Sequence, residues 1–202
     1  MEIILNQIGR RYNFNWIFRN INQKICTSDK LVILGANGSG KSTLMQIISG
    51  AISPSEGSIK WSTNNQEIVS EKVFRQLSFA SPYLELIEDF TLKEHLIFHF
   101  SLKESIEQLS VDEIIQLSGL AHASDKRIAY FSSGMKQRVK LLLAILSNTS
   151  LLLLDEPLSN LDKQAANWYT GLINRFAINR TIIVSSNNIE QEFEFCTKSI
   201  QL

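Results

Sequence analysis

The chain has 202 residues, of which 44% are hydrophobic, enough for one large domain with a buried core. Its 20 basic and 20 acidic residues cancel, so charge gives no support to a nucleic-acid surface, and we expect no nucleic-acid partner. Cys26 and Cys196 lie too far apart for metal-ligand spacing and are typical of a reducing compartment. We find neither a signal-peptide pattern nor an apolar run near the ~18 residues of a membrane span.

Strand-like and helix-like segments alternate in the order of an α/β protein. In chain order the pattern predicts strands over 1–8, 14–26 and 31–34, a helix over 42–49, and strands at 58–61 and before 79. Residues 84–130 have helical spacing and a composition rich in Leu, Ile, Glu, Lys and His, which indicates an inserted helical piece. The alternation then resumes with a helix over 133–147, a strand over 150–154, a helix over 163–177 and a strand over 181–185. This order predicts a mainly parallel sheet flanked by helices.

A complete phosphate-binding pattern, G-x-x-x-x-G-K-[ST], lies between the expected strand 31–34 and the following helix. Glycines let consecutive backbone N–H groups form an anion nest, and the helix start adds its positive end. Lys41 can reach the β- and γ-phosphates, and the Ser42 hydroxyl can bind Mg²⁺. The structural alternative is a glycine-rich turn that only caps the helix. The expected binding residues are Gly35, Asn37, Gly38, Ser39, Gly40, Lys41, Ser42 and Thr43.

Two carboxylates follow the all-apolar strand 151–154, and ligands bind at the carboxyl ends of strands in open α/β sheets. We expect Asp155 beside Mg²⁺, directly or through water. Glu156 is then placed to accept a proton from the attacking water or to orient it. For each carboxylate the alternative role is to cap the next helix.

Residues 131–138, Phe-Ser-Ser-Gly-Met-Lys-Gln-Arg, resemble the LSGGQ signature of ATP-binding cassette (ABC) ATPases. The order of motifs matches that family as well, since Asp155-Glu156-Pro157 follows the signature and residues 159–162, Ser-Asn-Leu-Asp, resemble the D-loop. The resemblance covers essentially the whole chain. It implies a P-loop NTPase fold with an N-terminal antiparallel β piece and an inserted helical subdomain. The expected division is a core of 1–82 and 136–202 and a helical subdomain of about 83–135.

The resemblance also implies that ATP is bound between two nucleotide-binding domains packed head to tail. The phosphate loop of one domain faces the signature of the other, where Ser132, Ser133 and Gly134 would bind the γ-phosphate at a helix start. Asp162, in the D-loop, is a further expected binding residue. Tyr12 lies where the family has the aromatic residue that stacks on adenine. It is equally compatible with an ordinary β-sheet aromatic, and Phe14 is the alternate.

Three departures from the family pattern bear on the rate of hydrolysis. The signature has Ser133 for a glycine and Met135 for an amide, which predicts altered affinity. The position at which the family has a glutamine, after the expected strand near residue 79, is occupied here by Ser81 or Pro82, and neither side chain supplies a long amide. Asn187 occupies the position of the switch histidine, and it can bind a γ-phosphate but cannot carry a proton. We therefore expect an ATPase that binds ATP and hydrolyses it slowly or only with a partner.

The expected function is the ATP-binding subunit of a membrane transporter, peripheral on the cytoplasmic face of the membrane. It would dimerise with a second nucleotide-binding domain, identical or different, and work with a separate pore subunit. Residues 83–90 are expected at the cleft that receives that subunit, although Leu84 and Leu86 could instead be core of the helical piece. Two alternatives stay open: a soluble ABC switch acting on ribosomes or nucleic acid, and a nucleotide-binding regulatory module with weak hydrolysis.

Overall fold

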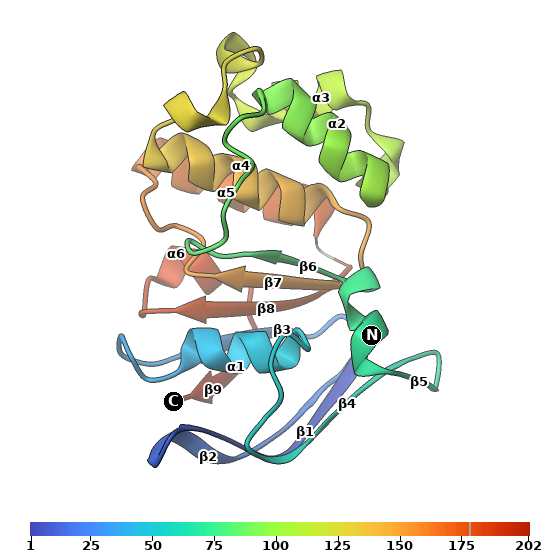
Figure 1. Ribbon diagram of the computed structural model, residues 1–202, viewed down its shortest axis with the longest axis vertical. Helices are drawn as coiled ribbons and strands as arrows, with labels where there is room; N and C mark the ends of the chain where they lie inside the picture. The colour runs from blue at the N-terminus through green and yellow to red at the C-terminus, as the bar shows by residue number, and fades with distance from the viewer. Residues whose placement is uncertain (178) are drawn as a thin grey trace. The chain divides into compact units, whose positions relative to one another are not determined.

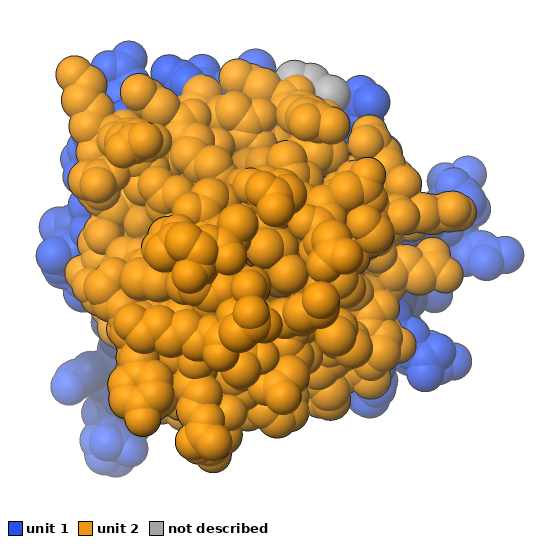
Figure 2. Space-filling view, turned by 90° about the horizontal axis from the view of Figure 1, so that it is seen from above, with its two compact units in different colours: residues 1–79, 149–156, 179–202 blue, residues 80–148, 157–178 orange. Residues whose placement is uncertain are grey.

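The computed structural model describes residues 1–177 and 179–202, and these form two compact units. Unit 1 contains residues 1–79, 149–156 and 179–202, and unit 2 contains residues 80–148 and 157–178. Figure 1 labels the helices and strands, and Figure 2 shows the residues of the two units in blue and orange. The domain boundaries expected from the sequence, near 83 and 135, stay a prediction; unit 2 also contains the helix at 133–146.

An antiparallel sheet begins unit 1. Its strands are β1 (Glu2–Tyr12), β2 (Asn15–Ile25), β4 (Glu56–Thr63) and β5 (Gln66–Ile68), in the order β2-β1-β4-β5. The pairing of β1 with β2 shifts register near Ile8 and again between Arg10 and Arg11. The pairing of β1 with β4 shifts as well, after Asn6. Such irregularities bend a strand and increase its twist, so the β1–β2 hairpin is not a flat ribbon.

A second sheet has five strands in the order β6-β7-β8-β3-β9. They are β3 (Lys30–Leu34), β6 (Leu77–Ala80), β7 (Leu151–Asp155), β8 (Thr181–Ser186) and β9 (Lys198–Gln201). β8 pairs in parallel with both β7 and β3, and β9 pairs in parallel with the other side of β3. The sequence did not predict β9, a short strand of mixed polarity whose pairing is supplied by its neighbour.

The core of unit 1 lies between these sheets and includes helix α1 (Lys41–Ile48). Side chains from β1, α1, β3 and β7 form one apolar cluster, in which Ile3, Leu44 and Leu153 are fully buried. All five residues of β7 and all six of β8 are buried, as expected for strands of a sheet that is covered on both faces. Helix α6 (Glu190–Phe193) and the 3₁₀ turn η1 (Ser70–Arg75) complete the unit.

Unit 2 is helical. It contains α2 (Leu92–Leu102), α3 (Val111–Ser118), α4 (Ser133–Leu146) and α5 (Lys163–Phe176), with 3₁₀ turns at Ile106–Gln108, Ala121–Ala123 and Ile128–Tyr130. Thr91 and Ser110 begin α2 and α3 with complete capping boxes, and Gly119 ends α3 in the left-handed conformation. The α/β fold class expected from the sequence is confirmed, with its antiparallel N-terminal sheet, parallel sheet and helical segment.

Two histidines on α2 are held in the neutral form by the packing of unit 2. His95 Nε2 accepts a hydrogen bond from the backbone N–H of Ile87 at 3.2 Å, and burial lowers the pKa of His95. The Ser147 hydroxyl donates to the Leu143 carbonyl at 2.6 Å, so His99 Nε2 must donate to Ser147, 2.9 Å away. Burial, and to a lesser degree the charge of Lys103, lowers the pKa of His99 to about 4.

We expect the free energy of unfolding to fall as the pH is lowered from 6.5 to about 4. Over this interval the unfolded chain binds a proton on His99 that the folded chain does not, so acid favours unfolding, by up to about 3 kcal/mol. Denaturant unfolding at a series of pH values measures the effect. His99→Gln should flatten the profile, whereas the control His122→Gln, at an exposed position of the same unit, should leave it unchanged. An undiminished slope in His99→Gln would contradict this assignment.

Candidate nucleotide site

The register of the parallel sheet brings the ends of three strands to one level. Leu34 at the end of β3 pairs with Ser186 of β8, and Asp155 at the end of β7 pairs with Ser185 of β8. The chain after each strand therefore begins at the same edge of the sheet. These continuations are the glycine-rich loop 35–40, Glu156 and Asn187.

The glycine-rich loop is shaped by close approaches that side chains would block. Gly40 has φ 102°, and a Cβ there would lie 2.4 Å from a methyl carbon of Ile17 and 2.8 Å from the Phe18 ring of β2. Gly40 is also the N-cap of α1 and makes no side-chain cap. Because Gly40 has no side chain that could accept from them, the first backbone N–H groups of α1 remain available to an anion, as in other anion sites at helix starts.

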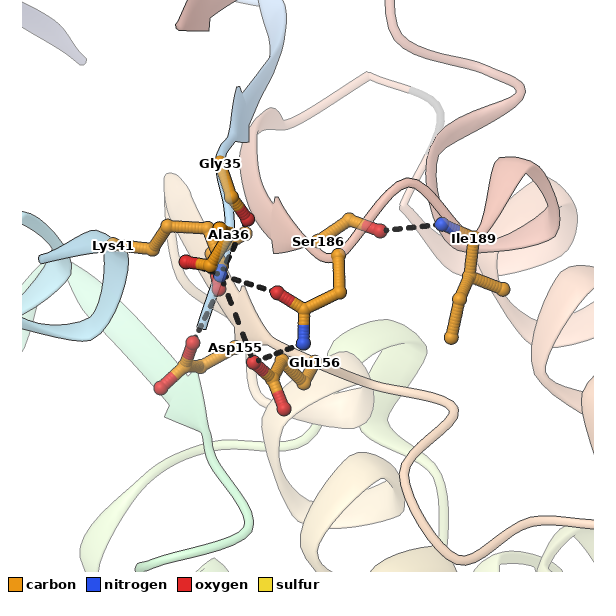
Figure 3. A network of polar contacts seen from close by, with 9 residues as sticks. Gly35, Ala36, Lys41, Asp155, Glu156, Ser186 and Ile189 are labelled. Carbon is orange, nitrogen blue, oxygen red and sulfur yellow. Dashed lines mark hydrogen bonds and ion pairs between the residues drawn. The ribbon is translucent and has the colours of Figure 1, made fainter. Parts of the chain in front are cut away.

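Lys41 is 4% exposed, and its ammonium is surrounded by oxygen atoms (Figure 3). Nζ donates to the carbonyl oxygens of Gly35 at 2.9 Å and Ala36 at 3.1 Å, and it donates to the Asn187 Oδ1 atom in a short hydrogen bond. Glu156 Oε1 lies 3.9 Å from Nζ. The oxygens of a bound triphosphate would therefore replace some of these protein oxygens as hydrogen-bond acceptors of the Lys41 ammonium, which is already shielded from water.

Asp155 and Ser42 provide the oxygen atoms suited to a magnesium ion. Asp155 is 1% exposed, and its Oδ1 accepts a short hydrogen bond from the Ser185 hydroxyl. Ser42 lies in the first turn of α1, directly after Lys41. A carboxylate and a hydroxyl on neighbouring elements are ligands that Mg²⁺ prefers, with phosphate oxygens and waters completing its octahedron. The donor set thus fits the ion.

Glu156 is held in a strained backbone conformation. Its φ of 44° is unusual for a residue with a side chain, and its backbone N–H donates to the Ser185 carbonyl at 3.0 Å. The carboxylate is 27% exposed and accepts a hydrogen bond from Asn187 Nδ2 at 3.0 Å. The fold therefore fixes a half-buried carboxylate beside the Lys41 ammonium, at the end of the strand that carries Asp155.

Asn187 contacts both Lys41 and Glu156, so it lies within the site predicted for it. Its amide uses the oxygen towards the ammonium and the NH₂ group towards the carboxylate. Gln76 lies before β6, and its carbonyl accepts hydrogen bonds from Leu151 N and from the Ser150 hydroxyl, at the start of β7. Gln76 is therefore at the amino end of the strands, whereas Lys41, Asp155 and Asn187 lie at or after their carboxyl ends.

Tyr12 is the last residue of β1, and its side chain is 48% exposed. The Arg10 guanidinium lies over its ring, 4.7 Å from the ring centre. The alternate, Phe14, is 93% exposed in the turn between β1 and β2. Tyr12 is thus the less exposed of the two aromatic candidates, and its role towards adenine stays a prediction.

The signature residues and Asp162 lie in unit 2, where they line one cavity of about 510 Å³. Ser132 caps α4 by accepting from Met135 N at 3.2 Å, and Asp162 caps α5 by accepting from Ala165 N at 2.8 Å. Gly134 approaches the D-loop closely, since a Cβ there would lie 2.9 Å from the Asn160 carbonyl. Two helix starts therefore open on one cavity, with Ser132–Gly134 on one side and Asn160–Asp162 on the other.

A second cavity of unit 2, of about 500 Å³, lies at the segment expected to receive another subunit. We call it the 82–88 groove; its walls are Pro82, Tyr83, Leu84, Glu85, Leu86, Glu88, Lys136 and Lys140. Tyr83 is 78% exposed and Leu84 is 44% exposed, so the core role considered for Leu84 is wrong. Lys140 donates to the Pro82 carbonyl at 2.6 Å, and Lys136 pairs closely with Glu88, which fixes one wall of the groove to α4.

Sequence reasoning missed Ser185, which donates to Asp155 and whose carbonyl holds Glu156. The available signal was the polar pair Ser185-Ser186 at the end of an otherwise apolar strand, next to the expected metal ligand. Among the described residues, none of the helices combines the length and the apolar composition that a bilayer-crossing span requires.

A glycine-rich loop before a helix, a lysine within that loop, and carboxylates at the end of a neighbouring parallel strand define a P-loop nucleotide-binding domain. The family model "ABC transporter" matches residues 18–159, which is more than half of the chain. The chain belongs to the ABC transporter family, as a nucleotide-binding domain of the ATP-binding subunits. Members of this family bind and hydrolyse ATP.

Two relatives and one solved structure illustrate the similarity. The cytochrome c biogenesis ATP-binding export protein CcmA of Reclinomonas americana is 34% identical over 93% of this chain and 84% of its own length. The lipoprotein-releasing system ATP-binding protein LolD of Pseudoalteromonas translucida is 30% identical over 86% of this chain and 79% of its own. The dimeric structure of the bacterial ABC transporter cassette MJ0796 shares the fold, with a TM-score of 0.82 and 22% identity over 99% of this chain and 94% of that one.

Proposed function

We propose that this chain binds and hydrolyses ATP to power a membrane transporter whose pore is a separate polypeptide. The observation that carries the proposal is the convergence of Lys41, Glu156 and Asn187 at the end of the glycine-rich loop. In this proposal the hydrogen-bonded group would supply a cation to the β- and γ-phosphates and a carboxylate to the attacking water. Phosphoryl transfer to water requires such groups, because its catalysis depends on positioning the reactants and on stabilising charge.

The nucleotide site is assigned to the predicted residues. The N–H groups of the loop 35–40 and of the start of α1 would bind the phosphate oxygens, with Lys41 turning its ammonium from Asn187 to the γ-phosphate. Ser42 and Asp155 would hold Mg²⁺, which supplies positive charge against the β- and γ-phosphates when bound. Glu156 would accept the proton of the attacking water. Asn187 would orient that carboxylate and the phosphate without carrying a proton itself, which favours slow hydrolysis in the isolated chain.

The dimer is the second element of the proposal. A helix start that presents Ser132, Ser133 and Gly134 in an open cavity offers hydroxyl and N–H donors to an anion. In a head-to-tail pair of cassettes this cavity would receive the γ-phosphate bound by the neighbouring copy, so ATP would hold the pair closed. Both an identical and a different second cassette fit this arrangement.

The 82–88 groove is the proposed contact with the pore subunit, at the cytoplasmic face of the membrane. It combines exposed apolar side chains, Tyr83 and Leu84, with charges of both signs, Glu85 and Lys140. A short segment with an apolar face and a basic residue would match this lining. The cargo follows from the partner, and the two relatives above, which differ in the process they serve, illustrate that the cassette does not fix it.

The proposal is tested by affinity purification of the tagged chain from detergent-solubilised membranes of its source. A polypeptide with several apolar spans should co-purify. Tyr83→Ala should lower its recovery at least several-fold without changing ATP binding, because it removes the most exposed apolar side chain of the groove. The control is Tyr130→Ala, at a position 67% exposed in the same unit and outside the groove. Recovery with ribosomes in a salt-dependent manner instead would contradict a transporter role.

A further inference from the structure

We infer that Arg10 is a positioning residue for the nucleotide base: its guanidinium covers one face of the Tyr12 ring and leaves the opposite face as the only one on which adenine can stack. The inference rests on the proposed function, because it assumes that ATP is bound at the Lys41 loop. It concerns a residue outside the P-loop and carboxylate motifs.

The Arg10 guanidinium is held by two contacts. Its Cζ lies 4.7 Å from the centre of the Tyr12 ring, and Nη1 donates to the Ser53 carbonyl at 2.9 Å. Nε is buried and has no hydrogen-bond partner among the residues that the structure describes. A guanidinium held by a backbone carbonyl and stacked on an aromatic ring limits the rotation of that ring, since turning it would break the cation–π contact.

Arg10 and Tyr12 lie on the same side of β1. The cation–π contact joins side chains two positions apart along the strand, and Arg10 is half-buried, two residues after the fully buried Ile8. Arg10 pairs across the hairpin with Phe18, and the Phe18 ring lies 2.8 Å from the position of a Cβ at Gly40. Tyr12 lies two residues, about 7 Å, further along β1 than Arg10. Because Arg10 pairs with the residue whose ring lies at the start of α1, this separation suits a base whose phosphates are bound at that helix start.

The neighbouring arginine provides a matched comparison. Arg11 has the same charge and also stacks on an aromatic ring, with its Cζ 5.5 Å from the ring centre of Trp16. Arg10 stacks on Tyr12 and Arg11 stacks on Trp16, so the two arginines make the same kind of contact with different rings. If the effect on ATP depends on the position of the arginine rather than on its charge or its contact with an aromatic ring, only Arg10 should affect the binding of the base.

The test compares MgATP with magnesium tripolyphosphate, which has the phosphates but no base, by calorimetry on the full chain. Arg10→Ala should weaken ATP binding about three- to tenfold and leave tripolyphosphate binding unchanged, because the loss is confined to stacking. Tyr12→Ala should show the same selectivity, and the double variant should lose no more than Tyr12→Ala alone, since Arg10 acts through that ring. Arg11→Ala should change neither ligand.

Three results would overturn the inference: equal weakening of both ligands by Arg10→Ala, no weakening of either, or additive losses in the double variant. Arg10→Lys, which retains the charge, is the second variant, and it should recover only part of the ATP affinity because a lysine cannot stack as a plane. Failure of the proposed function is a distinct outcome, since the parent chain would then bind neither MgATP nor magnesium tripolyphosphate.

Discussion

Replacing Lys41 by alanine is expected to lower the affinity for MgATP at least about 100-fold, which corresponds to about 3 kcal/mol. The structure gives the reason. The ammonium is 4% exposed and is the cation that the loop carbonyls of Gly35 and Ala36 and the amide of Asn187 hold at the start of α1. Its charge-assisted hydrogen bonds to phosphate would be made in a site largely shielded from water, where they are strong. Calorimetric titration with MgATP measures the loss.

The controls for this experiment separate binding from folding. Lys41→Met keeps most of the side-chain volume while removing the charge, and it should lose affinity as Lys41→Ala does. Lys60→Ala removes an exposed lysine from β4 of the same unit and should bind like the parent. If Lys41→Ala is folded by circular dichroism and binds MgATP with parental affinity, the phosphates are not at this loop.

Glu156→Gln is expected to retain ATP binding and to reduce hydrolysis by a factor on the order of 10² to 10⁴, the usual contribution of a positioned general base. The amide has the shape of the carboxylate but cannot take a proton from water. Glu156 lies at the end of β7 with a φ of 44°, fixed by a backbone bond to Ser185, so the new side chain starts from the same place. Turnover is measured by phosphate release, together with the affinity for MgATP.

The same variant tests the dimer, because an uncleaved γ-phosphate should hold two cassettes together. In the presence of MgATP, Glu156→Gln should elute at twice the monomer mass in size-exclusion chromatography, whereas the parent returns to the monomer as ATP is consumed. Glu67→Gln, on the exposed strand β5, is the control for loss of one charge. Hydrolysis by Glu156→Gln at the parental rate would exclude Glu156 as the base.

Much of the candidate site was predictable because its motifs are local in sequence. The loop 35–43 needs glycines at fixed positions, and Gly40 shows why: at φ 102°, with β2 only 2.4 Å from a Cβ, no other residue fits without displacing Ile17. The apolar run 151–154 predicted a buried strand, and β7 is buried throughout. The helix starts of unit 2 were predictable for the same reason, since Ser132 and Asp162 cap the turns that follow them directly.

Features that join distant segments were not predictable. Strand β9 has a mixed composition and is defined by its pairing with β3, where Leu202 N donates to the Leu34 carbonyl at 2.9 Å. The Ser185 hydroxyl on Asp155 joins positions 30 residues apart and depends on the register of β7 with β8. The Arg10 contact with Ser53 spans 43 residues and depends on the pairing of β1 with β4, in which Gly9 lies opposite Glu56.

The family, the phosphate loop, the two carboxylates and the helix starts can be read from the amino-acid sequence, because each is encoded by residue types at short, fixed spacing. Three features emerge only in the folded chain: Lys41, Glu156 and Asn187 form one hydrogen-bonded group, Leu84 is exposed, and Arg10 lies on Tyr12. These contacts depend on strand register and side-chain packing, which are set by the whole core rather than by any local segment.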